Sequence, residues 1–374
     1  MKLLLGIAVL LSGIALSACA DAGKVEDSQD KELRKKIGQM LMVGFRGFEL
    51  HDDMTIVKDI EERNLGGVIL FDYDVPRDVP ERNIRDLDQV QKLNTDIQSH
   101  AEIPLMIAVD QEGGNVARLK PEHGFHEMPS HQKLAEEGNP EQTREVSAKT
   151  AERLAELGFN INYAPVTDVN RNPENPIIGR LERSFSEDPD VVARHARAFM
   201  EGHHQHGVFS TIKHFPGHGS SKDDTHLGIA DVTEYWDEVE LQPFQELIDS
   251  DLQLIMTAHI FNERLDPDHP ATLSQKVITG LLREEMGYEG VIVSDDMQMN
   301  AIADYYGLEE ALELGINAGL DLLVFANNSV YEEDITERAV NKIAAMVEDG
   351  RVPLSRIEES YNRIMNFKEH LAND

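Results

Sequence analysis

Short apolar segments alternate with longer amphipathic segments along most of the chain. The apolar segments are rich in β-branched residues and nearly continuous, as in strands that are covered on both faces. The pattern therefore predicts eight buried, parallel strands separated by helices. The strands are expected at 40–43, 67–71, 105–109, 159–163, 208–212, 254–258, 291–294 and 322–325.

Helix starts fall between these segments. Asn139-Pro140 and Asp188-Pro189 each place a capping side chain before a proline at the first helical position. Eight strand–helix units in 374 residues fit a single (β/α)8 TIM barrel better than an open sheet. An open nucleotide-binding sheet would also carry a glycine-rich loop after its first strand, and no G-x-G-x-x-G or P-loop motif follows Val43.

The N-terminus is separable from this pattern. Residues 3–16 form an apolar run that has the length of a signal-peptide core and is too short to span a bilayer. The run ends in Leu16-Ser17-Ala18-Cys19, which resembles a bacterial lipobox, and Cys19 is the only cysteine. We predict a signal peptide over 1–18, a polar tether over 19–31 and one folded domain over 32–374.

Lipidation of Cys19 would anchor the protein to a membrane on its periplasmic or extracytoplasmic side. In a Gram-negative cell, Ala20 after the cysteine favours the outer membrane. The alternative is that Cys19 is one small residue of an ordinary secretory signal.

The charge is strongly acidic. The chain has 69 Asp and Glu against 35 Lys and Arg, a formal net charge of −34. Such a field repels phosphate backbones and anionic lipid, so we expect no nucleic-acid partner. The excess acid is typical of a strongly hydrated surface.

Polar residues follow six of the eight predicted strands directly or closely. Because active sites of (β/α)8 barrels lie at the carboxyl ends of the strands, these side chains should meet at one mouth. They are Asp110, Asp168, Lys213 with His214, His259, Asp295 and Asn327.

The densest group is Lys213-His214-Phe215-Pro216-Gly217-His218-Gly219, followed by Asp224-Thr225-His226. A loop with this many ionisable side chains is typical of a functional site, although His218 alone could be a buried structural histidine. A metal is an alternative for His214, His218, Asp224 and His226, but they lack a recognised ligand spacing. We predict no metal or cofactor.

A second group follows the seventh predicted strand in Val291-Ile292-Val293-Ser294-Asp295-Asp296. A barrel strand would hold the Asp295 carboxylate rigidly, as a nucleophile requires, and helix capping is the alternative. Asp296 points the other way and is expected to support or cap.

Three motifs, KHFPGHG with a following D-x-H, AVDQEGG at 108–114 and GVIVSDDM at 290–297, resemble the β-N-acetylglucosaminidase branch of glycoside hydrolase family 3. The resemblance runs from about Ile37 to the C-terminus. It implies a single (β/α)8 barrel and an exo-acting, retaining hydrolase without cofactor.

The resemblance places Asp295 at the catalytic nucleophile and His226 at the general acid/base, with Asp224 orienting the imidazole. A histidine suits this role, since its unperturbed pKa of about 6.5 allows proton transfer in both directions near neutral pH.

The resemblance also assigns sugar binding to Asp110, Arg118, Arg183, Lys213 and His214. Two simpler interpretations remain open: a structural Asp110–Arg118 ion pair, and a loop-capping role for Arg183. Asn115 departs from the arginine common in the family, and the segment 72–85 is longer than in compact members.

The predicted function is removal of terminal N-acetylglucosamine from peptidoglycan fragments or chitooligosaccharides. The alternatives are a phosphorylase acting on the same bond, a β-glucosidase, and a sugar-binding lipoprotein without activity. The last has no need of a nucleophile paired with an acid/base.

Overall fold

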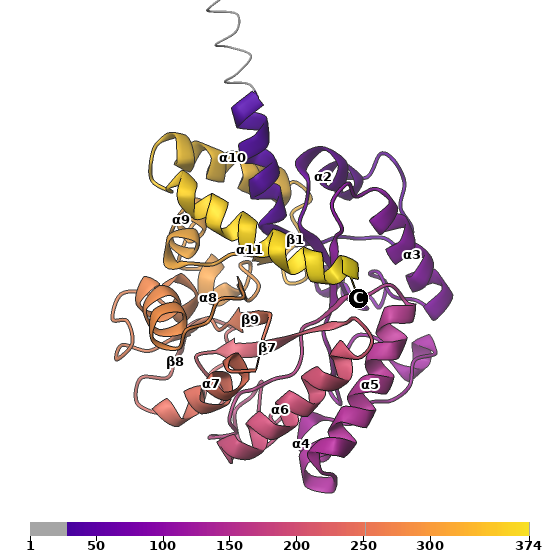
Figure 1. The fold of residues 1–374 in the computed structure, drawn as a ribbon, viewed down its shortest axis with the longest axis vertical. Coiled ribbons are helices and arrows are strands. Elements are labelled where there is room, and N and C mark those ends of the chain that lie inside the picture. The colour runs from indigo at the N-terminus through magenta and orange to yellow at the C-terminus, as the bar shows by residue number, and fades with distance from the viewer. Residues whose placement is uncertain (1–27, 251, 374) are drawn as a thin grey trace, which may run out of the picture.

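The computed structural model describes residues 28–250 and 252–373. In these residues, a sheet of eight parallel strands forms the centre, with helices arranged around it (Figure 1). The strand order is β11-β9-β7-β6-β3-β2-β1-β12, and a parallel bridge between Val293 and Leu322 joins the two ends. This confirms the predicted (β/α)8 barrel and all eight predicted strand positions. The strands are β1 (Leu41–Gly44), β2 (Gly67–Leu70), β3 (Met106–Val109), β6 (Ile161–Asn162), β7 (Phe209–Phe215), β9 (Leu254–Thr257), β11 (Val291–Val293) and β12 (Leu323–Phe325).

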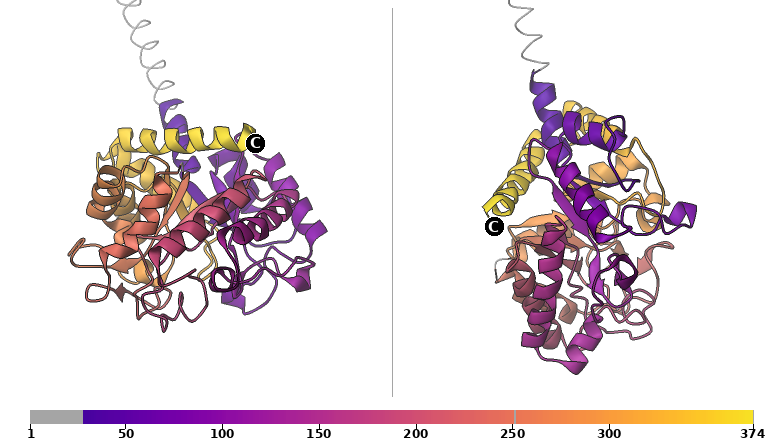
Figure 2. Two further views of the ribbon diagram at one scale, coloured as in Figure 1. Left: turned by 60° about the horizontal axis from the view of Figure 1, so that its bottom comes forward. Right: turned by 90° about the vertical axis from the view of Figure 1, so that its right-hand side faces the viewer.

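Helices surround the barrel on the outside (Figures 1 and 2). They are α2 (Thr55–Arg63), α3 (Leu87–Ser99), α4 (His131–Glu137), α5 (Pro140–Glu156), α6 (Pro189–His204), α7 (Gln242–Ile248), α8 (Asn300–Ala303), α9 (Leu308–Ala318), α10 (Ile335–Glu348) and α11 (Leu354–Asn373), with a π-helix, η5 (Lys276–Glu285). The two predicted starts are confirmed, because the side chain of Asn139 accepts from Gln142 N and that of Asp188 from Asp190 N.

The barrel strands are buried along their whole length. Their inner faces fill the barrel and their outer faces pack against the helices, which explains why the sequence shows unbroken apolar runs rather than alternation. Small elements lie in the loops that lead from the carboxyl ends of the strands to the next helices. They are β4 (Gln111–Gly113), β5 (Val116–Ala117), β8 (Ala230–Asp231), β10 (Ile260–Phe261) and four 3-10 turns, η1 (Val75–Arg77), η2 (Pro121–His123), η3 (Glu238–Leu241) and η4 (Ala271–Leu273).

A helix over residues 28–39 and α11 cover the face at which the strands begin (Figure 2). The helix is tied to its neighbours by Lys36 Nζ with Glu358 Oε1 at 3.1 Å and by Arg34 Nη1 donating to Asn341 Oδ1 at 2.7 Å. The described chain therefore enters the domain on the face opposite the carboxyl ends of the strands.

The predicted signal peptide, Cys19 and residues 19–27 of the predicted tether lie outside the described residues, and residues 28–31 belong to the entry helix. Within the described residues, no helix combines the length and the apolar character needed to cross a bilayer.

Candidate active site

A cavity of about 580 Å³ opens at the carboxyl ends of the strands. Seven of the eight predicted functional residues line it, although they lie at the ends of the strands β3, β7 and β11 or in loops that follow β3, β6 and β7. They are Asp110, Arg118, Arg183, Lys213, His214, His226 and Asp295. The eighth, Asp224, binds one of them.

The floor of the cavity is a network of alternating charges. Lys213 Nζ lies 2.9 Å from Asp110 Oδ1 and 2.7 Å from Glu112 Oε1. Arg118 Nη2 lies 3.2 Å from Asp110 Oδ2, and Arg183 donates to both oxygens of Glu112 at 2.8 Å. The Asp110–Arg118 ion pair foreseen as a simple alternative therefore exists, and both partners still face the cavity.

Glu112 is a residue that sequence reasoning missed, although it lies in the motif containing Asp110. Burial would raise the pKa of Glu112, but the charges of Arg183 and Lys213 outweigh burial and hold it below its ordinary value. The pKa of Asp110 is lowered in the same way, with burial opposed by Lys213 and Arg118. Both carboxylates are thus ionised and hold the cations in fixed positions.

Asp295 follows β11 and faces the same cavity. Burial alone would raise the pKa of this carboxyl, but the nearby imidazoles of His259 and His214 lower it below its ordinary value, with a smaller contribution from His226. Asp295 is therefore an ionised carboxylate in a largely enclosed setting, as nucleophilic attack requires.

Asp296 has the supporting position expected for it. Its Oδ1 accepts from Gln298 N at 3.1 Å and from Ala326 N at 3.0 Å, so it joins the loop after β11 to the end of β12. Burial raises the pKa of Asp296 to about 6.

His226 and Asp224 form the predicted pair. Asp224 Oδ1 lies 2.7 Å from His226 Nδ1 and also accepts from His226 N at 2.8 Å. Because Nδ1 is bound by the carboxylate, Nε2 is the ring nitrogen available to exchange a proton with a ligand. The His226 side chain is 54% exposed, so the pair lies at the open side of the cavity.

The loop after β7 is held by a buried carboxylate from the neighbouring strand. Asp168 Oδ2 lies 2.7 Å from His214 Nδ1, and Asp168 Oδ1 accepts from His214 N and His218 N at 3.2 and 2.7 Å. His218 is 1% exposed, and burial lowers its pKa to about 4. His218 also lines the cavity wall, so its neutral ring combines a structural position with access to the site.

Glu240 in η3 binds the backbone of the same loop. Its Oε2 accepts from Gly219 N at 3.1 Å, and burial raises its pKa to about 7. Asp168 was noticed only as a residue near a strand end, and Glu240 carries no sequence signal at all. As for the metal alternative, residues 28–250 and 252–373 contain no group of three His, Cys, Asp or Glu side chains that could hold an ion.

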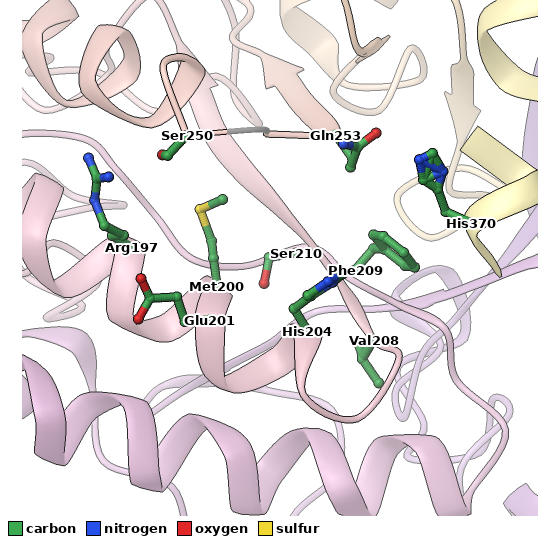
Figure 3. Close-up of a pocket in the computed structure, with 10 residues that line it drawn as sticks. All are labelled: Arg197, Met200, Glu201, His204, Val208, Phe209, Ser210, Ser250, Gln253 and His370. Atoms are coloured by element: carbon green, nitrogen blue, oxygen red, sulfur yellow. The ribbon is translucent and has the colours of Figure 1, made fainter. Parts of the chain in front are cut away.

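A second cavity, of about 500 Å³, lies near the beginning of β7 (Figure 3). Residues of α6, Phe209 and Ser210 of β7 and His370 of α11 point toward it. None of the predicted functional residues lines this cavity. Since barrel enzymes carry their chemistry at the carboxyl ends of the strands, the cavity containing Asp295 is the candidate active site.

The family of the chain follows from a match that covers most of its length. The model of the glycosyl hydrolase family 3 N terminal domain matches residues 32–367. The chain belongs to glycosyl hydrolase family 3. The resemblance predicted from the three motifs is therefore confirmed.

Proteins similar to this chain are named as hexosaminidases or N-acetylglucosaminidases. A beta-hexosaminidase of Tolumonas auensis is 35% identical, over 89% of this chain and 99% of the relative. Beta-hexosaminidase A of Pseudoalteromonas piscicida is 33% identical, over 90% of this chain. A solved family 3 beta-N-acetylglucosaminidase from Paenibacillus superposes with a TM-score of 0.83 at 36% identity, over 91% of this chain.

The chain spans different shares of these relatives. It covers 60% of the Pseudoalteromonas protein and 62% of the Paenibacillus structure, but nearly all of the Tolumonas enzyme. In each case the similarity extends over about nine-tenths of this chain.

Proposed function

We propose that this chain is an exo-acting, retaining β-N-acetylglucosaminidase that hydrolyses terminal N-acetylglucosamine from chitooligosaccharides or peptidoglycan fragments. The observation that carries the proposal is one cavity lined by both an ionised carboxylate, Asp295, and a carboxylate-bound histidine, His226. The names of the family 3 relatives support the choice of sugar.

The first half of the reaction forms a bond and breaks a bond at the anomeric carbon. An Asp295 carboxylate oxygen attacks this carbon while the bond to the leaving oxygen breaks, and His226 donates its Nε2 proton to that oxygen. The products are a glycosyl ester on Asp295, a neutral imidazole and the free alcohol of the aglycone.

The second half reverses the roles. Neutral His226 takes a proton from water, whose oxygen attacks the anomeric carbon and releases the Asp295 carboxylate. Asp224 stabilises the imidazolium that donates the first proton and forms again in the second half, and it fixes the tautomer of the neutral ring between them.

The charged floor binds the sugar hydroxyls in this proposal. Asp110 and Lys213 lie at its centre, with Arg118 on one side and Arg183 on the other. Because each charge is already balanced by a neighbour, a neutral sugar can replace water there without leaving a buried charge unpaired. His214, whose Nδ1 is held by Asp168, has its Nε2 at 3.4 Å from Arg183 Nη2 in the same floor.

The first test compares p-nitrophenol release from the β-N-acetylglucosaminide and the β-glucoside, with and without chelator and phosphate. We expect a preference for the acetamido sugar that neither addition changes. A requirement for phosphate would make the protein a phosphorylase, and equal cleavage of both sugars would make it a β-glucosidase. No turnover by folded protein would favour the sugar-binding lipoprotein.

We further propose that Cys19 is lipidated and anchors the enzyme on the extracytoplasmic side of a membrane, where peptidoglycan fragments or external chitooligosaccharides are found. The lipobox-like Leu16-Ser17-Ala18-Cys19 carries this part of the proposal. Its test is incorporation of labelled fatty acid into the wild type and its loss in Cys19→Ala.

A further inference from the structure

Two exposed valines at the rim of the active-site cavity have no role in the core. Val75 and Val330 are 51% and 47% exposed, and both line the cavity that contains Asp295. The polar floor is far less exposed, with the side chain of Lys213 at 3% and that of Asp110 at 16%. The valines therefore lie toward solvent, on the side at which the leaving group of a bound glycoside emerges.

The two valines are held by one buried ion network. Asp74, next to Val75, is fully buried and accepts from Arg46 Nε and Nη2 at 2.5 and 2.9 Å. The Arg46 guanidinium lies 3.7 Å from the ring centre of Tyr331, which is next to Val330. The loops that carry the two valines are thus attached to the same arginine.

A second arginine closes this network. Arg82 Nη1 lies 3.3 Å from Asp74 Oδ2, and its Nη2 donates to Asn327 O at 2.8 Å. Arg82 is 1% exposed. The long segment 72–85, noted in the sequence, therefore forms a braced loop that carries Val75 to the same cavity that Val330 lines.

The cavity offers little to an anionic leaving group. Its lining includes three lysine and arginine side chains, Arg118, Arg183 and Lys213, and each is already bound to Asp110 or Glu112. A carboxylate on the aglycone would lose hydration without gaining a free cation from these three. The acidic field of the whole chain opposes it further.

We propose that Val75 and Val330 form the wall of the aglycone subsite and select an uncharged amino-sugar ring over a muramyl unit with its carboxylate. The inference rests on the proposed glycosidase function and names its substrate class. Aliphatic side chains pack well against the C–H face of a pyranose ring, and burying that face removes apolar area from water.

The test uses three substrates and a variant of unchanged shape. The substrates are β-N-acetylglucosaminyl fluoride, whose leaving group is too small to reach the valines, chitobiose with its uncharged second ring, and the disaccharide of N-acetylglucosamine and N-acetylmuramic acid, which adds a carboxylate. We expect wild type to cleave chitobiose with at least about tenfold higher kcat/KM than the muramyl disaccharide, from apolar contact and charge repulsion together.

In Val75→Thr/Val330→Thr, each valine exchanges a methyl for a hydroxyl. We expect kcat/KM for chitobiose to fall about three- to tenfold and that for the fluoride to change less than about twofold. Leu354→Asn is the matched control, because Leu354 is 48% exposed at the start of α11 on the opposite face. This control should leave all three rates unchanged.

Different results separate the inference from the function on which it rests. A wild type that hydrolyses the fluoride but prefers the muramyl disaccharide would overturn the valine wall alone. So would a double threonine variant whose chitobiose and fluoride rates fall together or not at all. A folded wild type inactive on the fluoride would overturn the glycosidase proposal and the inference with it.

Discussion

Two adjacent carboxylates after β11 have opposite electrostatic surroundings. Imidazoles lower the pKa of Asp295 despite its burial, whereas burial raises that of Asp296 to about 6. Both residues line the cavity, but Asp296 Oδ1 accepts from two backbone N–H groups. The pair therefore separates a group suited to chemistry from one that supports it.

Asparagine substitutions at these two positions should separate the roles. Asp295→Asn removes the anion, so we expect kcat to fall at least about 10³-fold. Asp296→Asn keeps an oxygen that accepts from Gln298 N and Ala326 N, so most activity should remain. Steady-state rates with chitobiose, together with thermal unfolding of both variants, check this. Comparable losses in two folded variants would contradict the assignment.

The acid role of His226 predicts a dependence on the leaving group. His226→Ala should lower kcat/KM for chitobiose about 10²- to 10⁴-fold, because its alkoxide must be protonated as it leaves. The loss should be much smaller for the fluoride, which needs less assistance. Asp224→Asn keeps the imidazole and should have a milder effect. A uniform loss on both substrates would argue that His226 only shapes the loop.

At the scale of elements, the strands were predictable and the links between loops were not. Each barrel strand is buried on two faces, so its local sequence contains the whole signal. Glu112 is held by Arg183, 71 residues later, and Asp168 by His214, 46 residues later. No rule of sequence spacing predicts contacts between residues this far apart in the chain. The motif resemblance identified the candidate site residues, whereas only the fold shows which carboxylates hold them in position.

The terminal helix also makes contacts that could not be predicted from the sequence. The sequence does not reveal that Lys368 of α11 is buried. Lys368 Nζ donates to Gln39 Oε1 at 2.7 Å and to Gly66 O at 2.8 Å. Burial lowers the pKa of Lys368 to about 7. This helix therefore contributes a pH dependence to stability.

The sign follows from proton binding. Between the folded pKa of about 7 and the ordinary value near 10.5, the unfolded chain binds more protons at this site, so the free energy of unfolding should rise with pH. The gain is at most about 1.4 kcal/mol per pH unit. When the free energy of unfolding is measured with urea from pH 7 to 10, Lys368→Met should lack this rise relative to wild type. Lys36→Met, at an ion-paired lysine of the entry helix, is the control and should retain it.

At the scale of the whole molecule, the entry helix and the cavity lie on opposite faces. Helix 28–39 packs with α10 and α11 where the strands begin, whereas Asp295 and the valine wall lie where the strands end. The nine residue steps from Cys19 to residue 28 can span no more than about 32 Å. If Cys19 carries a lipid, this short link keeps the entry face toward the membrane and turns the cavity away from it.

Energy transfer from a labelled side chain to a membrane dye tests this orientation. In lipidated protein on vesicles, a label at Leu354→Cys on the entry face should transfer more strongly than one at Ser329→Cys beside the cavity. Since the lipid blocks the thiol of Cys19, each variant has one reactive cysteine. Equal transfer from both positions would mean that the domain tumbles freely about its link. Stronger transfer from Ser329→Cys would place the cavity against the bilayer, where only substrates at the membrane surface could enter.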